Sequence, residues 1–327
     1  MDIREIASRA GVSRTTVSRY LNDGYVSKEK RERIRRVIQE TGYVPSRHAQ
    51  QLRTGKTNLV GVIMPKINSQ SVARMVAGIT SELSGQNYQT LLANTDNDEH
   101  SEISFINLFS ARNHVDGIIL IATVLTPEHR EAIEALSIPL VVLGQRLEGV
   151  PCVYQDDYAA MRDLCRLAFR NTRKPGYIGV FDQDIAAGHE RLRGYLDACK
   201  EAGLSTSLET QKIVGFEADD GYFGAEEILH KVPDVDTLIC ATDELAFGAM
   251  MCALEYGKSV PEDIQVAGVG DSLLSRIARP SLSTVHLHYK SGGMLAARML
   301  LDLMRHGKSD KTDIVMDYEV YGRMSIR

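Results

Sequence analysis

The spacing of apolar residues predicts three short helices at the start of the chain. Apolar positions recur with helical spacing in residues 3–10, 14–22 and 28–41. Gly11 and Gly42 suit the left-handed residue that ends a helix, and they follow the first and third segments. Ser13 and Ser27 are placed to cap the second and third. Two short helices joined by a three-residue turn that starts with glycine form the helix-turn-helix pattern, whose second helix lies in the major groove of DNA.

The rest of the chain alternates short apolar runs with longer helical patterns. The runs are residues 59–64, 89–92, 117–121, 140–143, 177–181, 237–240 and 264–269. Strands that are apolar throughout are typical of parallel sheets covered by helices on both faces. A new helix after Asp156 and Asp157 indicates that a second sheet begins near residue 158. We therefore predict an all-α head followed by an α/β body of two doubly wound parallel-sheet subdomains.

Charge is distributed unevenly along a chain of otherwise ordinary composition. Hydrophobic residues make up 43% and charged residues 25%, as in folded globular proteins. Residues 1–56 hold 13 basic and 6 acidic side chains, a net charge of +7, which leaves 25 basic and 37 acidic side chains, a net charge of −12, in the remaining residues. A basic head on an acidic body indicates a polyanionic partner.

The sequence gives little indication of a membrane span, a disulfide, a metal site or a catalytic motif. The longest apolar stretch, residues 115–126, is shorter than the roughly 20 residues that cross a bilayer, and the charged start of the chain is unlike a signal peptide. Five cysteines without a C-x-x-C pair fit reduced thiols. His286 and His288 lack a third metal ligand at a sensible spacing. We expect a cytoplasmic protein with no membrane association, metal, cofactor or catalytic residue, since no dinucleotide, phosphate-loop or hydrolase motif is present.

The second predicted helix carries side chains suited to reading DNA. Its donors, with the capping serine, are Ser13, Arg14, Thr15, Thr16, Ser18, Arg19 and Asn22, and none is acidic. Arginine can bind guanine through two hydrogen bonds, asparagine can pair with adenine, and hydroxyls reach bases or phosphates. A solvated polar face on a small helical bundle is the alternative.

These segments resemble the LacI/GalR family of repressors. The resemblance is carried by Ile6-Ala7, Gly11-Val12-Ser13, Thr16-Val17-Ser18-Arg19, Leu21-Asn22, Val26-Ser27 and Gly42-Tyr43-Val44-Pro45, and it continues along the whole chain. It implies that Arg14, Thr15 and Arg19 read operator bases. It implies that Thr16, Ser18 and Asn22 hold phosphates or brace the helix. It further implies a periplasmic-binding-protein-like body and a homodimer on pseudo-palindromic operator DNA.

A short segment after the head is predicted to act as a hinge. Ser46 can cap it and Ala49 and Leu52 share one face, but so few residues form no stable helix alone in water. The resemblance implies that it becomes ordered on DNA and that Leu52 wedges into the minor groove; a simple linker is the alternative. The expected domains are residues 1–45 (head), 46–57 (hinge and linker) and 58–327 (effector binding and dimerisation), with an N-subdomain of about 58–157 and 288–313 and a C-subdomain of about 158–287 and 314–327.

Polar side chains follow the ends of the predicted strands, where doubly wound folds bind ligands. They are Lys66, Asn68, Gln145, Asp184, Arg191, Phe216, Thr242, Asp243 and Asp271. Charged groups pair with hydroxyls and a ring covers the apolar face of a sugar, so we predict a small carbohydrate effector. The resemblance implies pocket roles for four of them, Arg191, Phe216, Thr242 and Asp243. Asp243 could instead cap the helix that follows.

Gly144 and Gly270 stand where many sugar-responsive members of the family carry aspartate. This departure argues against the pocket of the lactose repressor and favours the sucrose- and trehalose-operon branch, and it would also suit a sugar phosphate. We predict a transcriptional repressor of a carbohydrate-utilisation operon that is controlled by a small sugar or sugar phosphate in the cleft between the subdomains. The alternatives are a global regulator controlled by a phosphoprotein corepressor, and a sugar-binding or sugar-converting protein without a DNA function.

A homodimer is expected, because two heads on a two-fold axis read a pseudo-palindrome. Apolar helix faces of the body could supply its interface. The candidate faces are Ile79 with Leu83, and Leu245 with Ala249 and Leu254.

Overall fold

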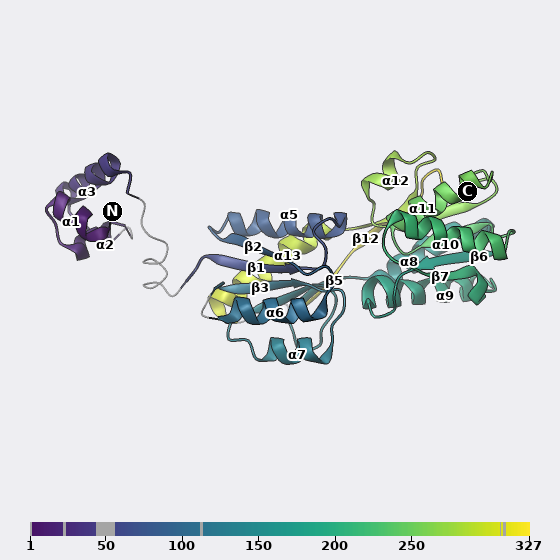
Figure 1. Ribbon diagram of the computed structural model, residues 1–327, viewed down its shortest axis with the longest axis horizontal. Helices are drawn as coiled ribbons and strands as arrows, with labels where there is room; N and C mark the ends of the chain where they lie inside the picture. The colour runs from purple at the N-terminus through teal and green to yellow at the C-terminus, as the bar shows by residue number, and fades with distance from the viewer. Residues whose placement is uncertain (1, 22–23, 44–55, 112–113, 308, 310–311) are drawn as a thin grey trace. The chain divides into compact units, whose positions relative to one another are not determined.

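The computed structural model describes residues 2–21, 24–43, 56–111, 114–307, 309 and 312–327, and it divides into two units, Met1–Thr57 and Asn58–Arg327. Figure 1 shows the helices of the first unit and the two sheets of the second. No helix in the described ranges is both long and apolar enough to cross a membrane.

The first unit is a three-helix bundle. Its helices are α1 (Ile3–Ala10), α2 (Arg14–Tyr20) and α3 (Lys28–Thr41), so α2 ends two residues earlier than predicted. Gly11 ends α1 with a φ of 62°, and Ser13 caps α2 by accepting a hydrogen bond from the backbone N–H of Thr16. Ser27 occupies the capping position of α3, but its side chain makes no capping hydrogen bond there. The core of the bundle consists of Ile6, Ala7, Ala10, Val17, Val26, Ile34 and Val37.

The first sheet of the second unit is parallel throughout. Its strands are β1 (Leu59–Met64), β2 (Gln89–Asn94), β3 (Gly117–Ile121), β4 (Leu140–Gly144), β5 (Cys152–Gln155) and β11 (Asp313–Met316), in the order β11-β5-β4-β3-β1-β2. The helices that cover it are α5 (Gln70–Ser84) and α13 (Tyr289–His306) on one face and α6 (Glu99–Ser110) and α7 (Pro127–Glu134) on the other (Figure 1). Because both faces are covered, the central strands are apolar throughout.

The second sheet repeats this plan, with one antiparallel edge. Its strands are β6 (Pro175–Gly179), β7 (Gln211–Ile213), β8 (Thr237–Cys240), β9 (Gln265–Val269), β10 (Ser283–Leu287) and β12 (Tyr318–Tyr321), in the order β12-β10-β9-β8-β6-β7. Only β12 runs antiparallel to its neighbour, β10. The helices that cover this sheet are α8 (Asp157–Ala168), α9 (Arg191–Glu201), α10 (Ala218–Lys231) and α11 (Asp243–Glu255), and α12 (Leu273–Ile277) follows β9.

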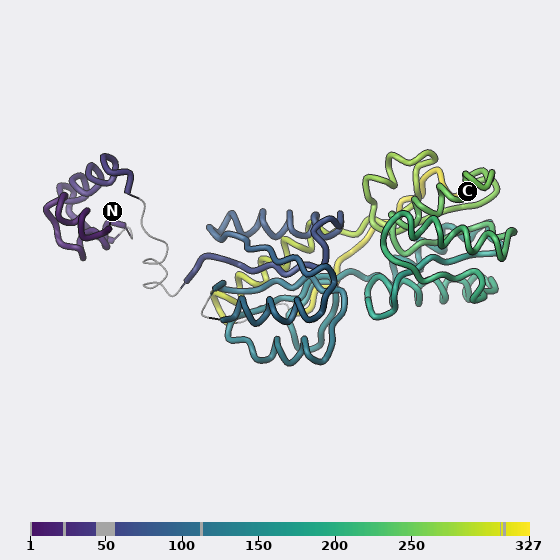
Figure 2. The backbone as a smooth tube through the Cα atoms, viewed as in Figure 1, coloured from purple at the N-terminus to yellow at the C-terminus, as the bar shows by residue number. Residues whose placement is uncertain are grey.

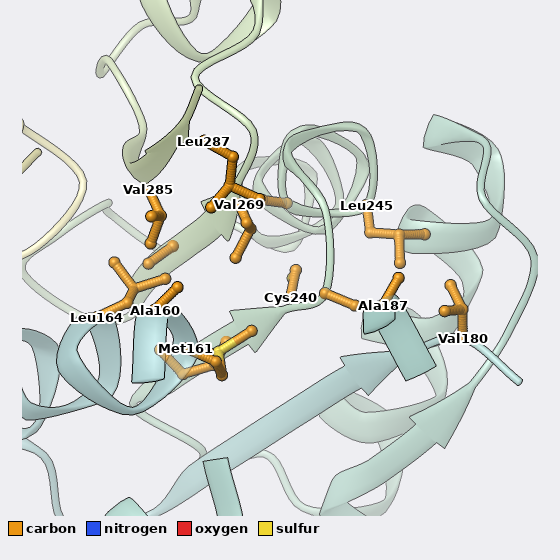
Figure 3. Packing of buried hydrophobic residues seen from close by; sticks show 14 of the residues in the cluster. Ala160, Met161, Leu164, Val180, Ala187, Cys240, Leu245, Val269, Val285 and Leu287 are labelled. Carbon is orange, nitrogen blue, oxygen red and sulfur yellow. The ribbon is translucent and has the colours of Figure 1, made fainter. Parts of the chain in front are cut away.

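Side chains from both covering layers fill the core of the second sheet. Figure 3 shows Met161 and Leu164 of α8 and Leu245 of α11 around strand residues such as Cys240 and Val269, all of them buried. The two sheets and their helices confirm the predicted α/β fold with two parallel-sheet subdomains.

The chain passes between the two sheets three times: after β5, after β10 and after β11 (Figure 2). The last passage lies after Met316, because β11 pairs with β5 of the first sheet. This is slightly later than the crossing expected near residue 314. Three connections therefore join the two sheets within one unit.

The apolar faces of α5 and α11 that were expected at a dimer interface are largely covered by other parts of the same chain. A Cβ atom added to Gly78 of α5 would lie 2.0 Å from the carbonyl oxygen of Lys290 on α13. Ile79, Leu83, Leu245 and Ala249 are fully buried within the chain. These four residues therefore do not supply the expected dimer interface, because they pack within the chain. Leu254, the fifth residue of the expected faces, is 38% exposed and stays a candidate.

Candidate functional site

A cavity of about 230 Å³ in the second unit lies at the strand ends that the two sheets turn toward each other. Parallel sheets leave their ligand sites at the carboxyl ends of strands, which explains its position. Seven of the nine residues predicted for the effector line it: Lys66, Asn68, Asp184, Arg191, Phe216, Thr242 and Asp243.

The base of the cavity holds a buried ion pair between Arg191 and Asp157. Nε and Nη2 of Arg191 lie 2.8 and 2.7 Å from Oδ1 of Asp157, and Nη1 donates to the carbonyl oxygen of Ala241 at 2.5 Å. Both residues are at least 95% buried. Burial raises the pKa of the Asp157 carboxyl, and the charge of Arg191 opposes that rise. The guanidinium thus joins α9 to α8 and to the end of β8.

Asp184 presents a buried carboxyl that has no ion-pair partner among the described residues. Its Oδ1 accepts hydrogen bonds from the N–H of Ala187 at 2.9 Å and from Nε2 of Gln145 at 3.3 Å. Burial raises the pKa of Asp184 to about 6, although the bond from Ala187 and the charge of Arg191 oppose the rise; Asp157 adds to it. Below this pH the carboxyl is protonated and can donate a hydrogen bond to a ligand.

Replacement of Asp184 by asparagine should stabilise the second unit at pH 7 by about 3 kcal/mol, since one pKa unit corresponds to about 1.4 kcal/mol. A pKa raised from 3.8 to about 6 in the folded state means that folding disfavours the ionised form. The cost is absent below about pH 4, grows between pH 4 and 6, and is complete above pH 6. Asparagine keeps a side-chain oxygen that can accept the hydrogen bond from the N–H of Ala187. Urea unfolding of both proteins from pH 4 to 7.5 should show the gain growing with pH, and a pH-independent difference would contradict it.

Asp243 and Thr242 begin α11 at the cavity wall. Thr242 is the capping residue, since its hydroxyl accepts from the N–H of Leu245. The Asp243 carboxylate instead accepts from the hydroxyl of Thr284 at 2.5 Å and from the N–H of Ser272 at 2.7 Å. It is not the N-cap considered as an alternative, and it joins the end of β8 to the segments after β9 and in β10.

Lys66 and Phe216, which both line the cavity, come from different subdomains and lie close together. Lys66 follows β1 of the first sheet, and its Nζ lies 5.6 Å from the ring centre of Phe216 in the second subdomain. It also lies 3.7 Å from Oε1 of Glu217. Both side chains of that ion pair are partly exposed, which limits its contribution to stability.

Gln145 and Asp271, the other two predicted effector residues, do not line the cavity. The buried side chain of Gln145 donates to the carbonyl oxygen of Thr123 and to Asp184. Asp271 is turned to the other side of its strand end, where it pairs with Arg276 at 2.6 Å, with His286 at 2.9 Å and with Arg323. Burial alone would raise the pKa of Asp271, but these partners hold it at about 2. The expectation that Asp271 faces a ligand is thus corrected.

Several lining residues were missed from the sequence. They are Arg74, Gln155, Asp157, Glu244 and Tyr289. Arg74 of α5 crosses to the second subdomain and donates to the carbonyl oxygens of Gly270 and Asp271 at 2.8 and 2.5 Å. Asp157 carried a signal, since two aspartates follow β5, but the sequence pattern alone gave no reason to aim Arg74 or Tyr289 at a ligand.

The candidate DNA-reading surface lies on α2 of the first unit. Arg14, Thr15 and Arg19 are exposed, and neither arginine side chain has a hydrogen-bond or ion-pair partner among the described residues. Thr16 is half-buried, and its hydroxyl is 2.8 Å from that of Ser13. Ser18 is half-buried as well. Four further predicted contacts, Asn22, Ser46, Ala49 and Leu52, lie outside the described residues.

A metal site finds no support in the part of the chain that the structure describes, where no group of three potential ligands occurs. His286 and His288 lie with ring centres 4.9 Å apart, and Nδ1 of His286 bonds to Asp271.

Comparisons with known proteins give similarities for both units. Residues 2–46 match the family model of the bacterial regulatory proteins of the lacI family, and residues 165–326 match that of the periplasmic binding protein-like domain. The chain is 30% identical over 321 residues to the sucrose operon repressor of Staphylococcus xylosus, which covers 97% of this chain and 98% of that protein.

Solved structures have the same fold. A complex of the transcriptional regulator CelR with cellobiose superimposes with a TM-score of 0.76 and 28% identity over 99% of both chains. The lac repressor dimer bound to operator and an anti-inducer gives a TM-score of 0.90 at 21% identity, over 99% of this chain and 98% of that chain.

Proposed function

Because the chain belongs to the LacI family of bacterial regulatory proteins, we propose that it is an operator-binding repressor whose DNA affinity is set by an uncharged carbohydrate in the cavity. The observation that carries this proposal is the cavity itself, which is lined by hydrogen-bonding side chains and an aromatic ring and lies between two subdomains. A ligand in this position contacts both subdomains and can shift their relative stability.

An uncharged ligand is favoured over a sugar phosphate by the charges of the lining. The described lining residues include three cations and five carboxylates: Lys66, Arg74 and Arg191 against Asp157, Asp184, Glu217, Asp243 and Glu244. Each cation already has a partner, whether a carboxylate or backbone carbonyls. Burial also raises the pKa of Glu244. A phosphate would meet more negative than positive groups. The names of two similar proteins, a sucrose operon repressor and a regulator in complex with cellobiose, also support a neutral sugar.

DNA is bound by the first unit in this proposal. Arg14, Thr15 and Arg19 read bases, because they are exposed on the second helix of a helix-turn-helix unit. A single head contacts few base pairs, so two chains form a homodimer on a pseudo-palindromic operator in the cytoplasm. Residues 46–57 connect the head to the body as a hinge.

Calorimetry and DNA binding test the proposal together. We expect heat on titration of the full chain with at least one of sucrose, cellobiose, trehalose or fructose, and none with sucrose 6-phosphate, trehalose 6-phosphate or fructose phosphates. The bound sugar should change the affinity for an operator selected from random DNA by about 5- to 150-fold, the usual range of allosteric coupling. Binding of a phosphate alone would overturn the ligand class. Salt-independent DNA binding, or none, would overturn the repressor function.

A further inference from the structure

Gln155 is a buried amide at the cavity with no hydrogen-bond partner. It is the last residue of β5, it lines the cavity, and it is 5% exposed. Neither Oε1 nor Nε2 has a partner within the described residues, and both atoms are shielded from solvent. An amide buried in this way lowers stability unless something else supplies its hydrogen bonds.

Comparable glutamines elsewhere in the second unit have partners. Nε2 of Gln265 donates to the carbonyl oxygen of Ala168 and lies 3.2 and 3.0 Å from the hydroxyls of Thr172 and Thr237. Its Oε1 accepts from the N–H of Arg327. Gln145 donates to Thr123 and Asp184. The fold therefore satisfies its other two fully buried glutamines, and Gln155 is the exception among the residues described.

Aliphatic groups lie near the amide of Gln155 on the side of α13. A Cβ atom added to Gly292 of α13 would lie 3.6 Å from Nε2 of Gln155, 3.7 Å from Cδ1 of Leu143 and 3.8 Å from Cγ of Met316. The amide thus lies in a layer of aliphatic groups and the first turn of α13. Because Gln155 also lines the cavity, a ligand bound there is a source of the missing hydrogen bonds.

We propose that Gln155 is a specificity-determining residue whose side chain turns into the cavity and binds hydroxyl groups of the effector through both atoms of its amide. This inference rests on the proposed carbohydrate-responsive function. A carboxamide offers an acceptor and a donor side by side, which match two neighbouring hydroxyls, one donating and one accepting. A fully ionised phosphate offers acceptors alone and would leave Oε1 unpaired. Buried polar groups of this kind discriminate strongly against ligands that lack the matching hydroxyl.

The test compares Gln155→Leu with Gln145→Leu in the full chain. Gln155→Leu should bind the sugar identified by calorimetry at least 10-fold more weakly, while its thermal unfolding midpoint without sugar stays the same or rises, because an unsatisfied amide has been removed. Gln145 is about as buried as Gln155, but its amide has hydrogen-bond partners. Gln145→Leu removes these bonds, so the thermal unfolding midpoint of this variant should fall. Deoxy analogues of the same sugar locate the contact. One analogue should lose affinity for the wild type and show no further loss with Gln155→Leu.

Three other outcomes would overturn the inference, and the third would also overturn the proposed ligand class. Unchanged sugar affinity in Gln155→Leu overturns the role of Gln155 but leaves the proposed function standing. Weaker binding together with a lowered unfolding midpoint assigns Gln155 a structural role and also overturns the inference. If the wild type binds none of sucrose, cellobiose, trehalose and fructose, the proposed ligand class fails and the inference fails with it.

Discussion

Replacement of Arg191 by methionine is expected to destabilise the second unit by about 3–5 kcal/mol and to abolish effector binding. The substitution leaves Asp157 buried at 4% exposure without its counter-ion, and removal of one partner of a buried ion pair typically has this effect. It also takes a donor from the carbonyl oxygen of Ala241. Urea unfolding followed by far-ultraviolet circular dichroism measures the loss, since the sequence has no tryptophan.

The double variant Arg191→Met with Asp157→Leu provides the control. Replacement of both partners of a buried ion pair by apolar groups of similar size is often neutral, so the double variant should regain most of the lost stability. It should still fail to bind sugar, because the polar base of the cavity is gone. A double variant that is less stable than Arg191→Met alone would show that the charge of Asp157 is not what makes the single change costly.

The arrangement of the second unit followed from the sequence because its strands are buried on both faces. The predicted strands at 59–64, 117–121 and 237–240 have the observed bounds, since each is a continuous apolar run that begins directly after a polar residue. The polar residues just after those strands then had to gather at one edge. This is why Lys66 and Asp243 were found.

Other features depend on packing between distant segments, which no local pattern records. Arg74 reaches Gly270 because α5 lies against α13 and beside the second subdomain. Asp271 follows a strand like Asp243 but turns to Arg276 and Arg323, so its position after a strand did not decide its direction. The apolar faces of α5 and α11 were read as possible dimer contacts for the same reason.

Arg14→Ala is expected to weaken binding to the operator by about 10- to 100-fold and to relax specificity at one base pair. A good arginine–guanine contact contributes about 1–3 kcal/mol of discrimination. Arg14 is exposed at the first position of α2, where alanine also favours a helix, so the fold of the first unit should be unaffected. The measurement is the affinity for an operator selected from random DNA with the wild-type chain, and for single-base variants of it.

Two matched variants separate base reading from charge in this experiment. Arg14→Lys keeps the positive charge but loses the planar pair of donors, so it should restore part of the affinity and little of the discrimination. Arg36→Ala removes an arginine of α3 that is also exposed and should leave base preference unchanged. If Arg14→Ala weakens binding to operator and to random DNA by the same factor, or if lysine restores full discrimination, Arg14 contacts phosphate and the operator is read by other residues of α2.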